Sequence, residues 1–230
     1  MRGSLLLHPH QKVSYGLQVR TWHSRLTFLL FESAAGPGTH KATMPDSFNS
    51  YMESPSADYW RELCLREGIL RSYRRGEHFF TAGKVARYFG YIKSGTLKYV
   101  ACGEDGEEHV IGLEFAGEFV TDFPFSLLGQ KARSSVVAET PCEIYCLPVA
   151  MLGERMKTDP QLMEMVMTGT EAVFSTVYDR YVDLHTKTPQ QRYQELISRH
   201  PDLFSLFPLK DIASFLNITQ THLSRLRKNI

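Results

Sequence analysis

Hydrophobic and polar residues follow three different rhythms along this chain. Between Tyr59 and Leu70, apolar residues recur at helical spacing, which predicts a helix. From Arg71 to Leu147, short runs of β-type residues alternate with recurring glycines. Beyond Pro148 the apolar residues return to spacings of three and four, which indicates helices again. The chain therefore combines a β region with helical flanks, in an α+β arrangement.

The glycine-rich region predicts an antiparallel β structure. Glu104-Asp105-Gly106 lies between two β-type runs, and Asp-Gly supplies the positive φ that a tight hairpin turn needs. Short strands at spacings of about 8–12 residues are typical of a sandwich, roll or barrel. The predicted strands are His78–Phe80, Tyr88–Lys93, Thr96–Cys102, His109–Phe115, Ser135–Ala138 and Glu143–Leu147.

A long helix with an apolar seam follows, over residues 159–187. The seam positions alternate three and four apart, at Met163, Val166, Thr170, Val173, Val177 and Leu184, with Arg180 interrupting the series. Such a seam favours pairing with a second copy in a dimer. Alternatively the same face packs on the β region of its own chain, and both arrangements can hold at different positions.

The segment 188–230 reads as a separate helical piece. In Thr188-Pro189-Gln190-Gln191, threonine can cap a helix, proline suits its first position, and Gln191 completes a capping box. His200-Pro201 ends that helix. Two apolar-patterned segments follow, split by Asn217-Ile218-Thr219, where Asn can take the left-handed conformation and Thr can cap the next helix. This pattern predicts a helix-turn-helix.

The polar face of the second of these helices carries groups suited to DNA. Amide and hydroxyl side chains can reach base edges, Arg225 can bind guanine through two hydrogen bonds, and the helix N-terminus suits phosphate oxygens. Segment 188–230 has a net charge of +3, although the whole chain has only +1. An ordinary helical hairpin with a solvated face is the alternative. The candidate DNA-binding residues are Thr219, Gln220, Thr221, His222, Ser224, Arg225, Arg227 and Lys228.

Composition indicates a globular protein and argues against a secreted or membrane-spanning one. At 230 residues with ordinary apolar and charged fractions, the chain can bury a real core. Four scattered cysteines do not suggest a disulfide-stapled secreted module, and no apolar run approaches the ~20 residues of a membrane span, so we expect a cytoplasmic protein. Residues 1–43 lack a sustained period. We expect a flexible extension, with Met44 as a possible natural start; a short helix over Val19–Phe31 is the alternative.

Four motifs stand out in the β region: Arg75-Gly76-Glu77, Ala82-Gly83, Tyr91 to Leu97, and Gly117-Glu118-Phe119. Together with the order of the parts, they resemble the Crp/Fnr family of bacterial transcription regulators. The resemblance covers roughly Tyr59 to Ile230, and the short C-terminal end resembles members from Bacteroidetes-type bacteria. It implies a cyclic-nucleotide-binding-like β-roll (jelly roll) over 44–158, a dimerisation helix over 159–187 and a DNA-binding domain over 188–230. The partners implied are double-stranded DNA, a second copy and RNA polymerase.

The family's nucleotide cassette is altered in this chain. Thr121-Asp122 stands where cAMP-binding members have Gly-Glu, and Arg133-Ser134 lies one residue later than the usual Arg-Ser pair. Asp122, Arg133 and Ser134 are thus the candidate effector residues, and the departures argue against cAMP. Another small molecule, or none, is the alternative. Four aromatic residues would make the pocket more apolar: Phe115, Phe119, Phe123 and Phe125.

Two other classes of function remain open. A cupin-like metal enzyme would need neighbouring histidines, but the one His-x-His lies at His8-Pro9-His10, and Cys142 and Cys146 are expected to be core residues. We therefore expect neither catalysis nor a metal, and no cofactor beyond a possible effector. A cyclic-nucleotide receptor whose C-terminal helices contact protein is the other possibility. The effector, the operator, the target genes and the sign of regulation are not specified by the sequence.

Overall fold

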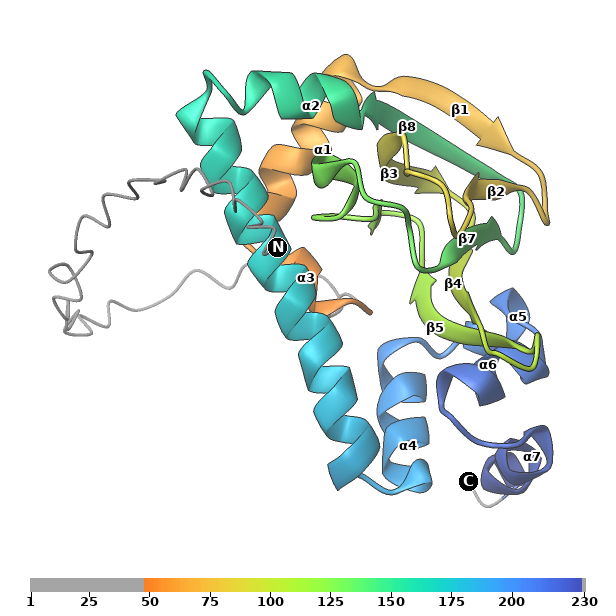
Figure 1. Cartoon of the computed structure of the whole chain (residues 1–230). Coiled ribbons are helices and arrows are strands. Elements are labelled where there is room, and N and C mark those ends of the chain that lie inside the picture. The colour runs from red at the N-terminus through yellow and green to blue at the C-terminus, as the bar shows by residue number, and fades with distance from the viewer. Residues whose placement is uncertain (1–47, 229–230) are drawn as a thin grey trace, which may run out of the picture. The chain divides into compact units, whose positions relative to one another are not determined.

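A computed structural model of the chain describes residues 48–228, so the expectations for residues 1–43 lie outside the described part. Its centre is a β-roll of two four-stranded antiparallel sheets, ordered β1-β8-β3-β6 and β2-β7-β4-β5 (Figure 1). All six predicted strands are present, and β1 and β6 are additional. The strands are β1 (Ile69–Tyr73), β2 (His78–Phe80), β3 (Tyr88–Ser94), β4 (Leu97–Cys102), β5 (Glu108–Glu114), β6 (Phe119–Val120), β7 (Ser135–Ala138) and β8 (Cys142–Pro148).

The two sheets enclose an apolar core. Ile92, Leu97 and Ile144 are fully buried between them. Cys142 and Cys146 lie on β8 as buried free thiols, which confirms their expected place in the core. The predicted hairpin joins β4 to β5, with Gly106 at a φ of 81°, a value that glycine adopts without steric cost.

The first helix ends earlier than its apolar spacing predicted. Helix α1 spans Ser56–Glu67, so the expectation that it continues to Leu70 was wrong. Gly68 ends the helix by donating its N–H to the Cys64 carbonyl at 2.8 Å, and a Cβ at Gly68 would lie 2.3 Å from that oxygen. The chain then turns into β1, where Leu70 pairs with Tyr145 of β8.

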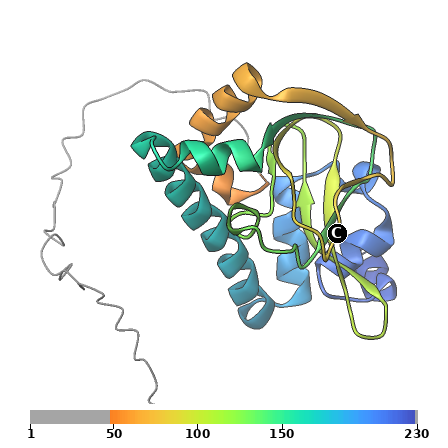
Figure 2. The same cartoon turned by 45° about the horizontal axis from the view of Figure 1, so that its top comes forward.

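Two further helices follow the roll, α2 (Val149–Arg155) and the long α3 (Pro160–Thr186). Asp159 caps α3 by accepting a hydrogen bond from the Leu162 amide at 3.0 Å. Gly169 lets α1 approach closely, because a Cβ there would lie 3.1 Å from the Trp60 indole nitrogen. Figure 2 shows α3 along one side of the roll, with α4 (Pro189–Arg199) beginning at its far end.

The C-terminal helices are α4 (Pro189–Arg199), α5 (Leu203–Leu206), α6 (Leu209–Phe215) and α7 (Gln220–Lys228). The capping box at the start of α4 is present as predicted: Thr188 accepts from the Gln191 amide, and Gln191 accepts from the Thr188 amide. Helix α4 ends before His200, also as predicted. Within residues 48–228, no helix combines the length and apolar character needed to cross a membrane.

These helices share an apolar core with the roll. Val110 and Leu113 of β5 belong to one buried cluster with Ile212 of α6 and Leu203 of α5. Ser214 accepts a hydrogen bond from the Val110 amide at 2.9 Å, so polar contacts add to this packing.

Candidate functional site

The turn between α6 and α7 has the geometry of a helix-turn-helix. Asn217 has a φ of 53°, and the Thr219 hydroxyl accepts a hydrogen bond from the His222 amide at 3.2 Å. Both features were predicted from the sequence. The Ile218 amide donates to the Ala213 carbonyl at 3.0 Å, and Ala213 is almost fully buried where the helices cross. The turn therefore fixes the direction in which α7 leaves α6.

Helix α7 has a buried apolar side and an exposed polar side. Leu223 and Leu226 are buried in the shared core. Ser224 is half-buried, and the Arg227 guanidinium lies 4.2 Å from the centre of the Phe204 ring. The structure therefore brings the predicted polar residues to one surface. Its exposed members are Thr219, Gln220, Thr221, His222, Arg225, Arg227 and Lys228.

This surface carries positive charge without opposing acids. Residues 212–230 contain no Asp or Glu, and the last turn of α7 holds three basic side chains. The acid that precedes it, Asp211, is buried and paired with the Lys98 ammonium of β4. An exposed helix with basic, amide and hydroxyl groups can dock on a phosphate backbone and reach base edges.

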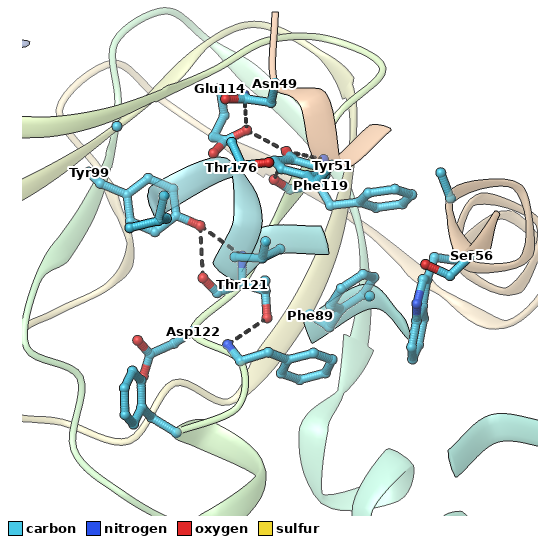
Figure 3. Close-up of a pocket in the computed structure, with 18 of the residues that line it drawn as sticks. Asn49, Tyr51, Ser56, Phe89, Tyr99, Glu114, Phe119, Thr121, Asp122 and Thr176 are labelled. Atoms are coloured by element: carbon cyan, nitrogen blue, oxygen red, sulfur yellow. Dashed lines mark hydrogen bonds between the residues drawn. The ribbon is translucent and has the colours of Figure 1, made fainter. Parts of the chain in front are cut away.

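A second candidate site is a cavity of about 290 Å³ between the roll and α3. Its wall is largely aromatic and aliphatic. Asp122 lies on one side, and the polar side chains of Asn49, Tyr51 and Glu114 lie at the other end (Figure 3). The segment after β6 is fixed to β4, because the Tyr99 hydroxyl donates to the Thr121 carbonyl at 2.7 Å. The aromatic lining comprises Tyr51, Trp60, Phe89, Tyr99, Phe119, Phe123 and Phe125.

The structure separates the three predicted effector residues. Asp122 lines the cavity, whereas Arg133 and Ser134 do not. Arg133 is exposed and lies 5.4 Å from the centre of the Phe125 ring, and Ser134 is buried in the loop before β7. Phe115 was also expected to line the pocket, which was wrong. Its ring instead stacks on His200 at 4.0 Å, in the core shared with the C-terminal helices.

A buried polar network closes one end of the cavity. Asn49 lies at its centre and donates through its side-chain amide to Glu114 at 2.8 Å and to Glu118 at 2.7 Å. The Tyr51 hydroxyl also donates to Glu114, and the Arg180 guanidinium donates to the Asn49 side-chain oxygen. Figure 3 shows Asn49, Tyr51 and Glu114 grouped together, away from Asp122.

Burial governs the electrostatics of these carboxyl groups. Desolvation raises the pKa of Glu114 well above its usual value, and the nearby charge of Glu118 raises it further. Desolvation likewise raises the pKa of Glu118, although amide hydrogen bonds from Phe115 and Asn49 oppose the shift. Burial raises the pKa of Asp122 to about 6. Each carboxyl group therefore favours its neutral form more than it would in water.

Sequence reasoning missed most of this cavity. Asn49 lies outside every predicted element, and its partner Glu118 is 69 positions away. Arg180 was visible only as the residue that interrupts the seam of the long helix, and the structure explains the interruption because Arg180 faces its own chain. Among residues 48–228, no group of three or more His, Cys, Asp or Glu side chains is placed to hold a metal ion.

Comparison with known proteins identifies a family that matches the β-roll and relatives that match a longer part of the chain. Residues 70–159 match the family described as the cyclic nucleotide-binding domain. The chain is 24% identical over 165 residues to Electron transport regulator A of Shewanella oneidensis, covering 66% of this chain and 65% of that protein. It is 26% identical over 165 residues to the Fumarate and nitrate reduction regulatory protein of Escherichia coli, with the same two coverages of 66% and 65%. The matches thus span slightly less than two thirds of these relatives' own length.

A solved structure shows the same fold. The structure of FixK2 from Bradyrhizobium japonicum superposes with a TM-score of 0.61 at 16% identity, covering 70% of this chain and 83% of that chain.

Proposed function

We propose that this chain, a homologue of the Crp/Fnr regulators, is a DNA-binding transcriptional regulator. It acts as a homodimer on a near-palindromic operator, and a small molecule in the β-roll controls it. The observation that carries the proposal is the surface of α7: a helix held by a buried helix-turn-helix core presents basic, amide and hydroxyl side chains and no acid.

The residues of α7 divide by the part of DNA that they can reach. Gln220, Thr221 and Arg225 are exposed and have the side-chain chemistry for base edges in the major groove. Thr219 and the first amides of α7 suit a phosphate oxygen, and Lys228 suits another as a point charge. Arg227 packs on Phe204, so we assign it to the phosphate backbone rather than to bases.

An exposed apolar row on α3 supports the homodimer. Side chains at spacings of four and three repeat along one face of the helix, and Met167, Phe174 and Tyr181 are 65%, 67% and 59% exposed. A row with this spacing is typical of the seam of a two-stranded coiled coil. Its exposed members are Met163, Met167, Phe174, Val177, Tyr181 and Leu184, and Thr170 in the same row is partly buried.

The cavity and the dimer seam share one residue. Val177 lines the cavity and also belongs to the exposed row of α3. Arg180, one turn further along, contacts Asn49 and lies over the rings of Phe48 and Phe215 at 5.5 and 5.3 Å. A ligand that changes the packing of α3 therefore acts on the dimer seam and on α6 together. Such a shift would change the separation of the two α7 helices.

Salt dependence tests this function against the alternative that the C-terminal helices contact protein. For the full chain and random double-stranded DNA, log Kd should rise linearly with the logarithm of the salt concentration, because DNA releases counterions when the protein binds its phosphates. Lys228→Ala should weaken binding to all sequences alike and reduce the slope by about 1. Lys84→Ala, at an exposed site in the roll, serves as the matched control. DNA binding that does not change with salt concentration would favour the alternative that the C-terminal helices contact protein.

Two further assignments follow from this function. A bacterial transcription regulator of this type works in the cytoplasm, and RNA polymerase is the partner that it would recruit or block. Both stand or fall with sequence-specific DNA binding.

A further inference from the structure

The cavity between the roll and α3 has an unusual charge balance for a nucleotide site. Among the described residues that line it, Arg180 carries the one positive charge. That guanidinium is already hydrogen-bonded to Asn49, which in turn donates to Glu114 and Glu118. A cyclic phosphate would bring its negative charge to a wall that contains Glu114 and Asp122. The desolvated anion would have no free cation to compensate it.

Asp122 is the polar group of the cavity that lacks a partner. Its Oδ2 atom is buried, and no residue among 48–228 donates a hydrogen bond to it. The Glu114 carboxylate, by contrast, accepts from both Asn49 and Tyr51. A buried carboxylate oxygen without a donor costs free energy, so a ligand that supplies one gains that interaction on binding. The pKa of Asp122 is raised by desolvation alone, which agrees with the missing donor.

The rest of the wall suits an apolar body. Trp60 packs on Phe89 with ring centres 4.8 Å apart, and Phe89 stacks on Phe123 at 5.1 Å, which forms a continuous aromatic surface. The faces of aromatic rings attract cations as well as apolar groups. The volume of about 290 Å³ lies at the small end of ligand pockets, which run from roughly 300 to 1,000 Å³.

We infer that the effector is a small apolar molecule with a cationic nitrogen, such as an aryl-alkyl amine, whose nitrogen donates to Asp122 while its body lies against Trp60, Phe89 and Phe123. This inference rests on the proposed role of the cavity as the effector site. It assigns to Asp122 the discrimination between amines and anions, so cAMP and other nucleotides are excluded by charge. The aromatic wall contacts the apolar part of an amine or an anion equally well, so it does not discriminate between them.

Trp60 provides a direct readout of binding. The full chain contains two tryptophans, Trp22 and Trp60, so Trp22→Phe leaves Trp60 as the one source of indole fluorescence. This variant is titrated with three probes that share a phenyl ring on a short chain: phenethylamine, phenethyl alcohol and phenylacetate. cAMP is the fourth titrant. We expect saturable quenching by phenethylamine, with a Kd about tenfold or more below that of phenylacetate, since a charged hydrogen bond contributes about 1.5–3 kcal/mol.

Two variants test whether Asp122 causes the preference for the amine over the carboxylate. Asp122→Asn keeps the shape of the side chain and removes its charge, and should bring the amine and the carboxylate within about threefold of each other. Asp105→Asn, on the exposed β4–β5 hairpin, is the matched control and should keep the full preference.

Several outcomes would overturn the inference. Phenylacetate or cAMP binding as tightly as phenethylamine would refute the exclusion of anions, and equal binding of the alcohol would show that a neutral donor suffices. Retention of the preference in Asp122→Asn, or saturable binding by none of the probes, would also overturn it. Random-pool DNA binding is measured on the same preparations. Loss of ligand binding with intact DNA binding rejects this inference alone, whereas loss of DNA binding rejects the proposed function.

Discussion

Single carboxyl groups of the roll differ in how well their surroundings compensate for burial. Glu118 accepts hydrogen bonds from the Asn49 and Phe115 amides, at 3.0 and 2.9 Å. Asp122 has no such donor at its buried oxygen among the described residues. A polar group left in this state lowers the stability of the fold, and such groups concentrate where ligands bind. The two cases separate a structural carboxyl group from a candidate recognition group.

The first prediction concerns the stability cost of Asp122. Its pKa in the folded chain is about 6, whereas an unfolded aspartate has about 3.9. The folded chain therefore binds the proton more tightly than the unfolded chain does. As pH rises from about 4 through 6, the ionisation of Asp122 lowers the free energy of unfolding. We expect Asp122→Asn to gain in melting temperature relative to the wild type over this pH range and to keep the gain at pH 7.5.

Thermal unfolding of both proteins across this range checks the prediction. The difference between their melting temperatures is the relevant quantity, because other titrating groups cancel in it. A constant difference between pH 4 and pH 7.5 would mean that Asp122 is not desolvated in the folded chain.

At the scale of elements, α3 has two apolar faces with different partners. Leu162, Val166 and Thr176 are buried against the chain's own α1, η1 (Ser50–Glu53) and roll segments. The row that contains Phe174 and Tyr181 is exposed. The seam predicted from the sequence combined residues of both faces. It included Val166 and Val173, whereas the exposed row contains their neighbours Met167 and Phe174. Spacing alone cannot assign a face to a partner when apolar residues occupy both.

The second prediction tests the exposed row as a dimer seam. Phe174→Glu places a charge at its centre and should convert the dimer to a monomer, because two carboxylates would be buried opposite each other. Ser175→Glu introduces the same side chain one residue later, at an exposed site off the seam, and should leave the dimer intact. Sedimentation at several protein concentrations measures both. An unchanged dimer in Phe174→Glu would place the interface elsewhere.

Local signals predicted the elements that they encode. Asp105-Gly106 gave the β4–β5 hairpin, Thr188-Gln191 gave the start of α4, and Asn217-Thr219 gave the turn before α7. Strands β1 and β6 were missed because pairing with β8 and β3 stabilises them rather than their own composition. Helix α5 has only four residues, too few to show a period.

At the scale of the whole described chain, a buried ion pair joins the roll to the C-terminal helices. The Lys98 ammonium of β4 lies 2.9 Å from Glu139 and also contacts Asp211 of α6. Its side chain is 14% exposed, and both acids are 7% exposed. Lys98 therefore holds two buried acids from different parts of the chain. Such a contact favours one arrangement of the DNA-binding helices relative to the roll.

The third prediction removes this cation. Lys98→Met should lower the free energy of unfolding by about 3–5 kcal/mol, because the buried carboxylate of Asp211 loses its cationic partner, whereas Glu139 keeps its ion pair with Arg75 at 2.6 Å. Lys93→Met removes an exposed lysine that pairs with Glu143 on the roll surface, and should cost at most about 1 kcal/mol. Urea unfolding measures both variants. Equal costs would show that the Lys98 pair is solvated.

The candidate sites were predictable to different degrees. The surface of α7 follows from a nine-residue segment, where helical period and turn residues determine which side chains are exposed. The cavity brings together Asn49, Glu114 and Arg180, which are far apart in sequence and belong to different elements. Only tertiary packing places them together, so of the effector residues proposed from the motif, Asp122 alone lines the cavity.

Selection of bound sequences from a random double-stranded DNA pool tests the central claim most directly. The full chain should enrich sites with two half-sites in near two-fold symmetry, their centres about 34 Å apart along the duplex. Arg225→Ala should bind the selected site more weakly by about 1–3 kcal/mol and tolerate any base at one position of each half-site. Failure of the wild type to enrich any sequence, or identical affinity and preference in Arg225→Ala, would contradict base reading by α7.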